Sequence, residues 1–440
     1  MIDEPQDKFI MSTEEAKGKK ALLVSAYKDS KTKEICDEHL TELELLCETY
    51  GIQVVSKFPC LLRKYEASTF LTKGKLQEVK SLADELDADL VIFDDEISAA
   101  QQRNLEKELE LTVMDRSEVI LGVFAQRAQT KEARLQIELA LTKYQAPRLK
   151  RMWTHLSRQG GTAGGGGSGG GGYLKGEGEK QIEIDKRLIQ RRINMLSQEL
   201  EEVKLNRKTQ RVQRQRAGIP VFAIIGYTNA GKSTLLNALT DAGVFTEDKL
   251  FATLDTTTRK FNLQNNQEIL LIDTVGFIRK LPHLVIAAFK GTLEEALEAD
   301  ILLHVIDASH PHALEQAQTS IEVLKELNAD KKPIITILNK IDTIEDLAKI
   351  NQLRFKYPKT VLISAKSKQG FEDLQKLMIE EIQNQRTQVK LVIPQSEYHL
   401  VSKILQEGRI LNQDYEDNDV ILNVEVNKIL ANKLTKYTVS

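Results

Sequence analysis

Hydrophobic and polar positions over residues 20–117 follow a pattern that predicts alternating strands and helices. Apolar runs such as ALLVSAY (21–27) and DLVIFDD (89–95) have the length and composition of buried strands. KLQEVKSLADELDA (75–88) has the spacing of an amphipathic helix. Strands separated by helices of this length are typical of crossover connections on a parallel sheet. We therefore expect an N-terminal α/β domain over residues 1–117.

From about residue 130 the apolar positions recur at spacings of three and four. They continue on both sides of GGTAGGGGSGGGG (160–172), in which ten of thirteen residues are glycine. Two heptad-like helices joined by a loop predict an antiparallel helical hairpin over residues 118–216, with a glycine-rich tip at 160–180. Pro147 should kink or interrupt the first helix. The seam consists of Leu135, Leu139, Thr142, Ala146, Leu149, Trp153 and Leu156, then Ile189, Ile193, Leu196, Leu200 and Val203.

Residues 217–384 return to alternating apolar strands and helices, which indicates a second α/β domain with a mostly parallel sheet. Residues 385–440 read as strand (VKLVIP), helix (SEYHLVSKILQEG), strand (VILNVEV) and helix (KILANKLTKY), which predicts a small α+β domain. The fold class is therefore an α/β multidomain protein.

Composition is that of an ordinary globular chain, with 41% hydrophobic and 28% charged residues. No apolar run approaches the roughly 18 residues of a membrane span, and the acidic N-terminus does not resemble a secretory signal. Cys36, Cys47 and Cys60 lack metal-ligand spacing and favour a reducing compartment. We expect a cytoplasmic, monomeric protein.

The charge is unevenly distributed. Residues 143–216 contain 17 Lys and Arg against 7 Asp and Glu, a net charge of +10 in a chain whose total is −3. A basic segment in an acidic protein favours a surface that faces nucleic acid, although a solvated charged helix would give the same count.

The most informative motif begins where the apolar strand PVFAII ends. The residues from Gly226 to Ser233 spell G-x-x-x-x-G-K-S, and a helical segment follows. Glycines let backbone N–H groups surround phosphates, Lys232 can reach the β and γ phosphates, and the Ser233 hydroxyl can ligate Mg²⁺. This stretch predicts a nucleotide phosphate site at a helix N-terminus.

Forty residues later, LLIDTVGF ends another apolar strand. Asp273 can hold the Mg²⁺ shell through water, and the Gly276 N–H can reach the γ-phosphate. A D-x-x-G motif at this distance from a P-loop supports a G domain. FATLDTTTRK, between the two motifs, offers Thr253, Thr256, Thr257 and Thr258 as switch threonines, and spacing alone does not choose among them.

The base specificity follows from TILNKID, in which N-K-x-D suits guanine. Asn339 can meet the N7 side of the base, and the stem of Lys340 can cover the ring. The Asp342 carboxylate can accept hydrogen bonds from N1–H and the 2-amino group, which adenine lacks. In LISAK, the Ala365 N–H can reach O6. The four motifs in this order predict GTP as the substrate.

Phe277 occupies the position after D-x-x-G where Ras-type enzymes have the glutamine that orients water. The catalytic group must then come from a partner or an ion; otherwise the domain binds GTP and scarcely hydrolyses it. Asn229 is either a ligand for K⁺ near the β and γ phosphates or a neutral loop residue.

Taken together, FATLD, DTVGFIRKLPH, TLEEALEADILLHVIDAS, HLSRQ and GEGEKQIEIDKRLI resemble the HflX family, GTPases related to the Obg group. The likeness covers nearly the whole chain. It implies GTP-dependent binding to the large ribosomal subunit and separation of stalled ribosomes. It also implies that Thr253 is the Mg²⁺ ligand and that Phe277 fits the family pattern. FLTKGK has Thr72 where the family has glycine, so no nucleotide role is assigned to the N-terminal domain.

These motifs and the resemblance together define the expected site. Lys232, Thr253 and Gly276 are the predicted catalytic residues, and Ser233 and Thr253 are the predicted Mg²⁺ ligands. The expected function is a GTPase that splits or rescues ribosomes; a non-catalytic GTP-dependent anti-association module and a ribosome-assembly GTPase are the alternatives. The predicted nucleotide contacts are Gly226, Tyr227, Thr228, Asn229, Ala230, Gly231, Lys232, Ser233, Phe251, Ala252, Thr253, Leu254, Asp255, Asp273, Thr274, Val275, Gly276, Asn339, Lys340, Ile341, Asp342, Ser364, Ala365 and Lys366.

Overall fold

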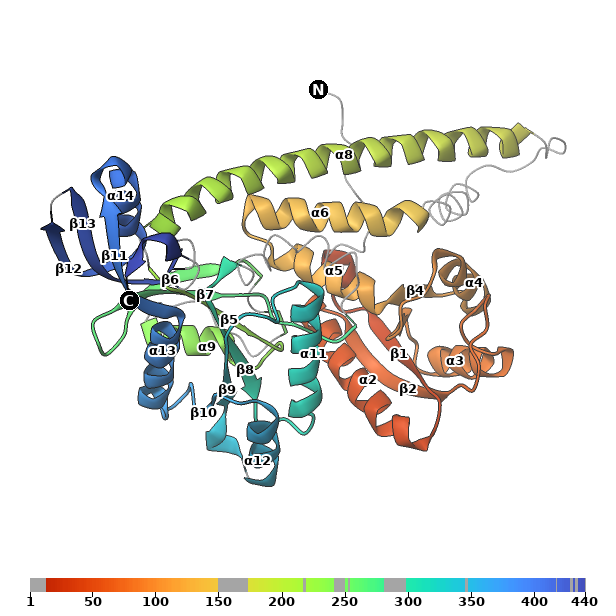
Figure 1. Ribbon diagram of the computed structural model, residues 1–440. Helices are drawn as coiled ribbons and strands as arrows, with labels where there is room; N and C mark the ends of the chain where they lie inside the picture. Colours follow the sequence, from red (N-terminus) through yellow and green to blue (C-terminus); the bar gives the residue numbers. More distant parts are fainter. Residues whose placement is uncertain are drawn as a thin grey trace. The chain divides into compact units, whose positions relative to one another are not determined.

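The chain divides into two compact units in the computed structural model (Figure 1). The first contains Met1–Glu201, Glu247–Leu254 and Lys280–Lys290; the second contains Glu202–Thr246, Asp255–Arg279 and Gly291–Ser440. The structure describes residues 13–148, 173–216, 219–240, 250–251, 254–280, 298–344, 347–416, 418–427, 430–431 and 434–439.

The N-terminal part of the first unit is a parallel sheet with helices around it, as the sequence predicts. Its strand order is β2-β1-β3-β4, and every neighbouring pair is parallel. Apolar side chains from strands and helices form the core, among them Leu22, Val91 and Leu105. The elements are α1 (Thr13–Ala16), β1 (Lys20–Tyr27), α2 (Ser30–Tyr50), β2 (Gln53–Leu61), α3 (Lys73–Glu85), β3 (Leu90–Phe93), α4 (Ala99–Leu109), β4 (Thr112–Asp115) and α5 (Arg116–Arg127).

Helix boundaries in this domain follow local capping chemistry. Asp29 and Thr32 form a reciprocal capping box at the start of α2, and Ser98 and Gln101 do the same at α4. Helix α2 ends at Gly51, whose φ of 97° lies in the left-handed region that glycine adopts without a Cβ penalty. The turns that bring each helix back to the sheet are therefore fixed by adjacent residues.

Buried charged side chains lie at the carboxyl edge of this sheet. The guanidinium of Arg116, 1% exposed, lies 3.1 Å from Asp94 Oδ1 and 2.7 Å from Glu42 Oε2. In the same unit, Lys280 Nζ lies 2.9 Å from Asp94 and 2.6 Å from Asp95. Burying Asp94 is tolerated because opposite charges surround it.

The two helices of the predicted hairpin lie side by side in Figure 1. Helix α6 (Lys131–Gln145) is capped by Thr130 and passes into η1 (Ala146–Arg148), so Pro147 ends the α-helix as predicted. Helix α8 (Tyr173–Arg216) buries Leu196 and Leu200, and its Arg192 forms hydrogen bonds with Glu138 of α6. The glycine-rich tip at 160–172 and the seam positions Leu149, Trp153 and Leu156 lie outside the described residues.

The second unit contains a six-stranded sheet with the order β10-β9-β8-β5-β7-β6, in which only β6 runs antiparallel to its neighbour. This agrees with the predicted mostly parallel G-domain sheet. Its elements are β5 (Val221–Gly226), α9 (Lys232–Thr240), β6 (Thr257–Asn262), β7 (Glu268–Asp273), β8 (Ile301–Asp307), α11 (Ala313–Glu326), β9 (Ile334–Asn339), η3 (Ile341–Thr343), α12 (Leu347–Lys356), β10 (Thr360–Leu362) and α13 (Phe371–Gln385).

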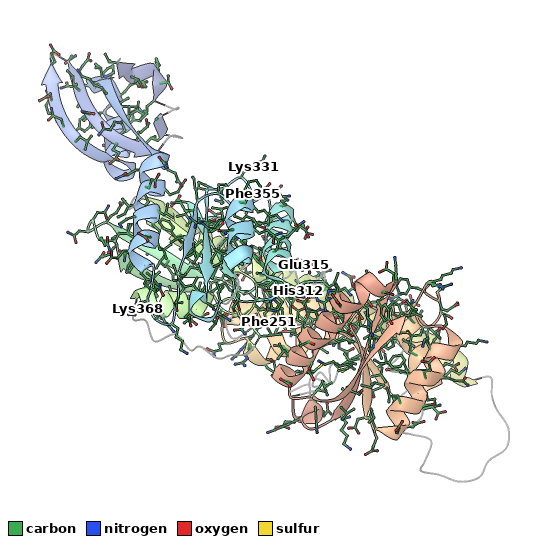
Figure 2. The ribbon with its side chains drawn as sticks, turned by 90° about the horizontal axis from the view of Figure 1, so that it is seen from below. Phe251, His312, Glu315, Lys331, Phe355 and Lys368 are labelled. Atoms are coloured by element: carbon green, nitrogen blue, oxygen red, sulfur yellow. The ribbon has the colours of Figure 1, made fainter. Side chains whose placement is uncertain are left out.

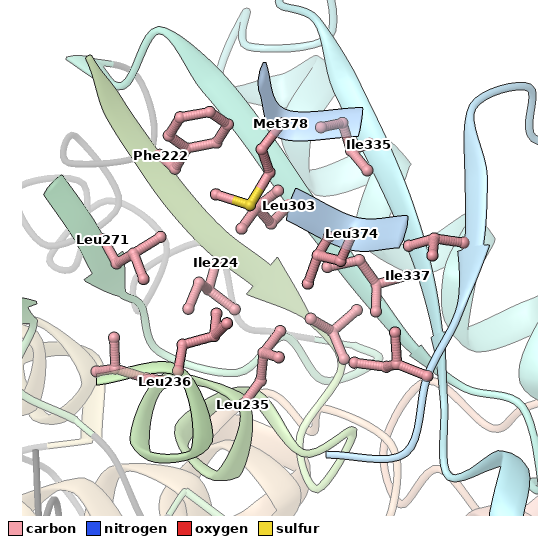
Figure 3. Packing of buried hydrophobic residues seen from close by; sticks show 14 of the residues in the cluster. Phe222, Ile224, Leu235, Leu236, Leu271, Leu303, Ile335, Ile337, Leu374 and Met378 are labelled. Carbon is pink, nitrogen blue, oxygen red and sulfur yellow. The ribbon is translucent and has the colours of Figure 1, made fainter. Parts of the chain in front are cut away.

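One face of this sheet carries the larger apolar core, which Figure 3 shows in close view. Ile224 of β5 lies beside Leu235 and Leu236 of α9, and Phe222 of β5 and Met378 of α13 belong to the same cluster. Because the strands are parallel and packed in register, β5, β7, β8 and β9 all end at one edge of the sheet.

The C-terminal residues form a four-stranded antiparallel sheet with the order β12-β13-β11-β14. Its elements are β11 (Arg386–Pro394), η4 (Gln395–Glu397), α14 (Tyr398–Glu407), β12 (Arg409–Glu416), β13 (Asp419–Asn427), η5 (Thr435–Tyr437) and β14 (Thr438–Val439). The predicted order omits β12, an edge strand of largely exposed residues whose sequence, RILNQDYE, lacks a buried apolar alternation. For KILANKLTKY the structure describes a short 3₁₀ turn at Thr435–Tyr437, while parts of that segment lie outside the described residues.

Among the residues that the structure describes, no helix is both long enough and apolar enough to cross a membrane.

Replacing Arg116 should destabilise the first unit selectively. Arg116→Met leaves Asp94 and Glu42 without their guanidinium partner, so the free energy of local opening should fall by about 3–5 kcal/mol. Hydrogen exchange of peptides covering β3 and β4 measures this change. Lys20→Met is the matched control because its pair with Asp87 is solvent-exposed and contributes less than about 1 kcal/mol. Equal effects of the two substitutions would contradict the assignment.

Candidate nucleotide-binding site

The predicted motifs gather at the carboxyl edge of the six-stranded sheet. The phosphate loop follows β5, the D-x-x-G segment follows β7, and the N-K-x-D segment follows β9. Ligands of open parallel sheets bind at this edge, where loops leave the strands and helices begin.

Two glycines of the phosphate loop are required by space and by backbone conformation. Gly226 has a φ of 148°, and a Cβ there would lie 2.2 Å from the carbonyl oxygen of Val305. Gly231 has a φ of 94°, and a Cβ would lie 2.3 Å from Asn339 Nδ2. Asn229 also has a positive φ, 60°, a conformation that asparagine tolerates. The loop therefore lies against β8 and β9 closely enough that larger residues would displace it.

Lys232 is buried at the start of α9, where its Nζ donates to the Tyr227 carbonyl at 2.7 Å. Burial lowers the pKa of this ammonium to about 8, and the nearby Asp273 opposes that shift. An ammonium whose charge is poorly solvated gains from an anionic phosphate. The side chain thus lies inside the loop that would enclose the phosphates.

Ser233 and Asp273 form the candidate Mg²⁺ site. The Ser233 hydroxyl donates to Asp273 Oδ2 at 2.6 Å, and the aspartate is fully buried. A hydroxyl and a carboxylate are hard oxygen donors that fit Mg²⁺, which commonly retains several waters. When bound, Mg²⁺ would neutralise charge developing on the phosphates.

The D-x-x-G segment is bonded directly to the phosphate loop. Thr228 N–H donates to the Phe277 carbonyl at 2.7 Å, and Phe277 N–H donates to the Gly226 carbonyl at 3.0 Å. A Cβ at Gly276 would lie 2.9 Å from Lys232 Nζ and 2.8 Å from Thr228 Cγ2. Gly276 is thus beside Lys232, and its lack of a side chain allows that approach.

Phe277 points into the protein core. Its side chain is 1% exposed and packs in a cluster with Ala223, Ile225 and Leu302. A benzyl group also has no hydrogen-bonding atom for water. The residue at the position of the Ras glutamine therefore serves packing, as its chemistry suggested.

Asn339 links the loops of the base site. Its Nδ2 donates to the Ala230 carbonyl at 2.9 Å, and its Oδ1 accepts from Ala365 N–H at 2.9 Å. The sequence assigned the Asn339 amide and the Ala365 N–H to the base itself. The structure shows both groups engaged with each other, so the bracing role was missed.

Asp342 lies in the short 3₁₀ turn after β9 and is exposed. A hydrogen bond from the Ser364 side chain lowers the pKa of its carboxyl, which remains an anionic acceptor at neutral pH. Lys340 has a left-handed φ of 63°, and its Nζ pairs with Asp307 Oδ2 at 2.7 Å. Asp307, which belongs to none of the four nucleotide-binding motifs, can therefore orient the lysine stem that is expected to cover the ring.

The remaining predicted contacts are of three kinds. Those buried at the motif loops are Tyr227, Thr228, Ala230, Thr274, Val275 and Ser364. Thr274 Oγ1 also donates to the Ile224 carbonyl. Ile341 is partly buried, and Lys366 is exposed. Ala252 and Thr253 lie outside the described residues, so the switch threonine and its Mg²⁺ role stay predictions. Phe251 and Leu254 belong to the first unit, whereas Asp255 begins the next stretch of the second unit. The rings of Phe251 and Phe124 pack edge to face, with their centroids 4.5 Å apart.

His304 was missed by sequence reasoning, although a histidine within ILLHVID is an unusual residue in an apolar strand. It is fully buried, and neither ring nitrogen has a hydrogen-bond partner among the described residues. Burial, together with the Lys232 charge, lowers the pKa of the imidazole to about 4, so it is neutral near pH 7. The ring packs edge to face on Tyr357.

Comparisons with known proteins cover most of the chain. Family models match residues 37–125 (GTP-binding GTPase N-terminal), 127–214 (GTP-binding GTPase Middle Region) and 221–340 (50S ribosome-binding GTPase). The GTPase HflX of Chlamydia pneumoniae is 45% identical over 433 residues, which cover 98% of this chain and 90% of the relative. That of Escherichia coli is 39% identical over 411 residues, covering 93% and 94%. A crystal structure of a GTP-binding protein from Sulfolobus solfataricus with GDP has 28% identity, covers 82% of this chain and 98% of its own, and gives a TM-score of 0.42.

Asp342→Asn should weaken GTP binding roughly tenfold or more, because one carboxylate accepts from two guanine donors. The fold should be unchanged because the side chain is exposed. Titration with GTP and with xanthosine triphosphate measures the effect. The asparagine amide can donate to the 2-carbonyl of xanthine, so the variant should favour xanthosine triphosphate over GTP. Unchanged GTP affinity would reject the assignment of the base site.

Proposed function

The chain belongs to the HflX family of GTPases, and from this premise we propose that it docks on the large ribosomal subunit in its GTP-bound state and promotes ribosome splitting or rescue. GTP hydrolysis and association with ribosomes are supported by the family matches. What we propose in addition is the step that GTP binding drives, which is the splitting or rescue of ribosomes.

The observation that carries this proposal is a basic helical hairpin in the same chain as a GTP site. Helix α8 buries one face and leaves Ile184, Leu188 and Met195 exposed. Arg191 falls on the same stripe, because positions i, i+4, i+7 and i+11 of a helix share one face. An uncovered stripe with aliphatic and cationic side chains suits a ribosomal surface, where phosphates and apolar protein groups both occur.

The glycine-rich tip at 160–172 fits the same partner. Glycine backbone can approach RNA without side-chain clashes. Ordering thirteen residues would cost about 13–26 kcal/mol, more than a typical domain stability of about 5–15 kcal/mol. With almost no side chains, this segment can bury little surface of its own, and an external surface would offset that cost. We therefore assign it to the ribosome-directed function and not to the GTP site.

The catalytic apparatus fits activation by a partner. Lys232 and the Gly276 N–H would hold the γ-phosphate, and Ser233 with Asp273 would hold Mg²⁺. Mg²⁺ neutralises phosphate charge when it is bound. Because Phe277 is buried in the core, the group that orients water comes from the bound large subunit or from an ion.

Two alternatives make different predictions for hydrolysis. In an anti-association module, GTP serves only as an assembly ligand and large subunits leave the single-turnover rate unchanged. A splitting factor is accelerated by large subunits and lowers the fraction of intact ribosomes in a sucrose gradient. An assembly GTPase would bind immature large subunits in preference to mature ones. Co-sedimentation with GDP and with a non-hydrolysable GTP analogue tests the docking step common to all three.

Shortening the glycine-rich tip should abolish splitting without damaging the fold. Replacing residues 160–172 with a two-residue turn should leave the melting temperature and GTP affinity almost unchanged, while ribosome splitting falls sharply. A length-matched control with the same composition in shuffled order should split ribosomes like the parent. If the shortened variant splits ribosomes as well as the parent does, the loop is a passive linker.

We also propose that K⁺ binds beside Asn229 and neutralises charge near the β and γ phosphates. Asn229 is exposed in the phosphate loop, and its left-handed backbone presents an amide side chain at the loop surface. Hydrolysis should be faster in KCl than in NaCl at equal ionic strength, and Asn229→Ala should remove the difference. Equal rates in both salts would refute the K⁺ proposal, and Asn229 would then be a neutral loop residue.

A further inference from the structure

Phe355, near the end of α12, is exposed to an unusual degree. Its side chain is 93% exposed, although the neighbouring Leu353 is buried in the core. Among the described residues of the G domain, it is the single large hydrophobic side chain that is exposed. Figure 2 shows it projecting from this domain. A lone phenylalanine that leaves its whole ring in water gives no stability to the fold.

Two cationic residues adjoin Phe355 in sequence, and a third, Lys331, lies at the same edge of the sheet. Arg354 and Lys356 flank it, and Lys356 Nζ is held at 2.8 Å by Gln318 of α11. Neither Arg354 nor Lys331 forms an ion pair with an acid among the described residues, although Asp330 adjoins Lys331. By contrast, Lys359 is paired with Glu381. The charges beside the ring thus remain available to an anion.

The topology places these residues together, away from the GTP site. Lys331 precedes β9, and Phe355 precedes β10; these two strands are adjacent and parallel. Both residues therefore lie at the amino edge of the sheet, and Figure 2 shows them at the same end of the G domain. The motif loops follow the carboxyl ends of the strands. This surface, defined by Lys331, Arg354, Phe355 and Lys356, is separated from the nucleotide by the sheet.

We propose that this surface binds an unpaired RNA nucleotide, whose base stacks on Phe355 and whose flanking phosphates lie against Arg354, Lys356 and Lys331. Every base offers a π face to an aromatic ring, and single-stranded RNA sites combine such rings with cationic side chains. One exposed ring is sufficient for one base. The two components required for such a site are therefore both present.

A protein partner fits the same surface less well. Protein interfaces are enriched in aromatic residues and arginine but depleted in lysine, and their hot spots cluster in well-packed, desolvated pockets. Here a single exposed ring and three cationic residues share one edge of the sheet, with no second exposed large hydrophobic in the described part of the G domain. Charge complementarity therefore favours the phosphate backbone of RNA.

The proposal rests on the proposed function only for the source of the RNA, which would be the large ribosomal subunit. The stacking site itself can be tested with free RNA. The two ideas can consequently fail separately.

The experiment uses tryptophan fluorescence as a local probe in the full chain. The chain has one tryptophan, Trp153, so Trp153→Phe combined with Phe355→Trp gives a protein with a single indole at the surface. Tryptophan keeps the capacity to stack, and stacking on a base quenches its emission. The probes are a 12-nucleotide single-stranded RNA, a duplex of the same length, and purified large subunits, all with a non-hydrolysable GTP analogue.

The single-stranded RNA and the large subunit should quench the probe, and the duplex should not. Arg354→Glu together with Lys356→Glu should reduce the slope of log affinity against log salt by about 1.4, or about 0.7 for each lost phosphate contact. The matched control is Trp153→Phe with Tyr415→Trp, because Tyr415 is also exposed but is flanked by Asp414 and Glu416. That probe should remain unquenched by RNA.

Three outcomes would overturn the proposal. They are quenching by neither RNA nor large subunits, equal quenching of the two probes, and a response to large subunits without a response to single-stranded RNA. The last result would assign the surface to a partner other than single-stranded RNA. Co-sedimentation in parallel separates the two proposals: a protein that pellets with large subunits but shows no quenching refutes the stacking site alone.

Discussion

The nucleotide site depends on one buried amide. Asn339 donates to the Ala230 carbonyl and accepts from Ala365 N–H, and it occupies the space that a side chain at Gly231 would need. The loops for the phosphates and for the base are thereby held at a fixed separation before ligand arrives. An amide with one partner removed would leave a buried polar group unsatisfied, which is costly. This explains why the chain combines glycine at 231 with asparagine at 339.

Backbone contacts also hold the phosphate loop in place. Gly226 lies against the Val305 carbonyl, and two backbone hydrogen bonds join Phe277 to the phosphate loop. These contacts involve only main-chain atoms and closely packed glycine, so they tolerate little movement. A response to the γ-phosphate must then come mainly from the segments that flank this rigid centre. The FATLD stretch is the candidate, because it lies between the phosphate loop and β7 in sequence.

Features governed by local pattern were predictable from the sequence, whereas those governed by tertiary pairing were not. The parallel sheets follow from apolar runs alternating with helices, and the phosphate loop follows from residue spacing after a strand. The edge strand β12 was not predicted, because an exposed strand lacks the alternation of apolar and polar residues. The pair between Lys340 and Asp307, and the bridging role of Asn339, join residues distant in sequence. No spacing rule in a single sequence identifies such partners.

The buried position of Phe277 prevents the residue after D-x-x-G from orienting a water molecule. A glutamine introduced there would direct its amide into an apolar cluster with Ala223, Ile225 and Leu302, where hydrogen-bond partners would have to replace those of water. The chain therefore does not gain an internal water-orienting group by a single exchange at this position. Hydrolysis then requires a water-orienting group from another source, which we propose to be the bound subunit or an ion. Under the proposed function, this arrangement would link nucleotide turnover to occupancy of the ribosome, because a subunit that supplies the water-orienting group would be present only while the protein is docked.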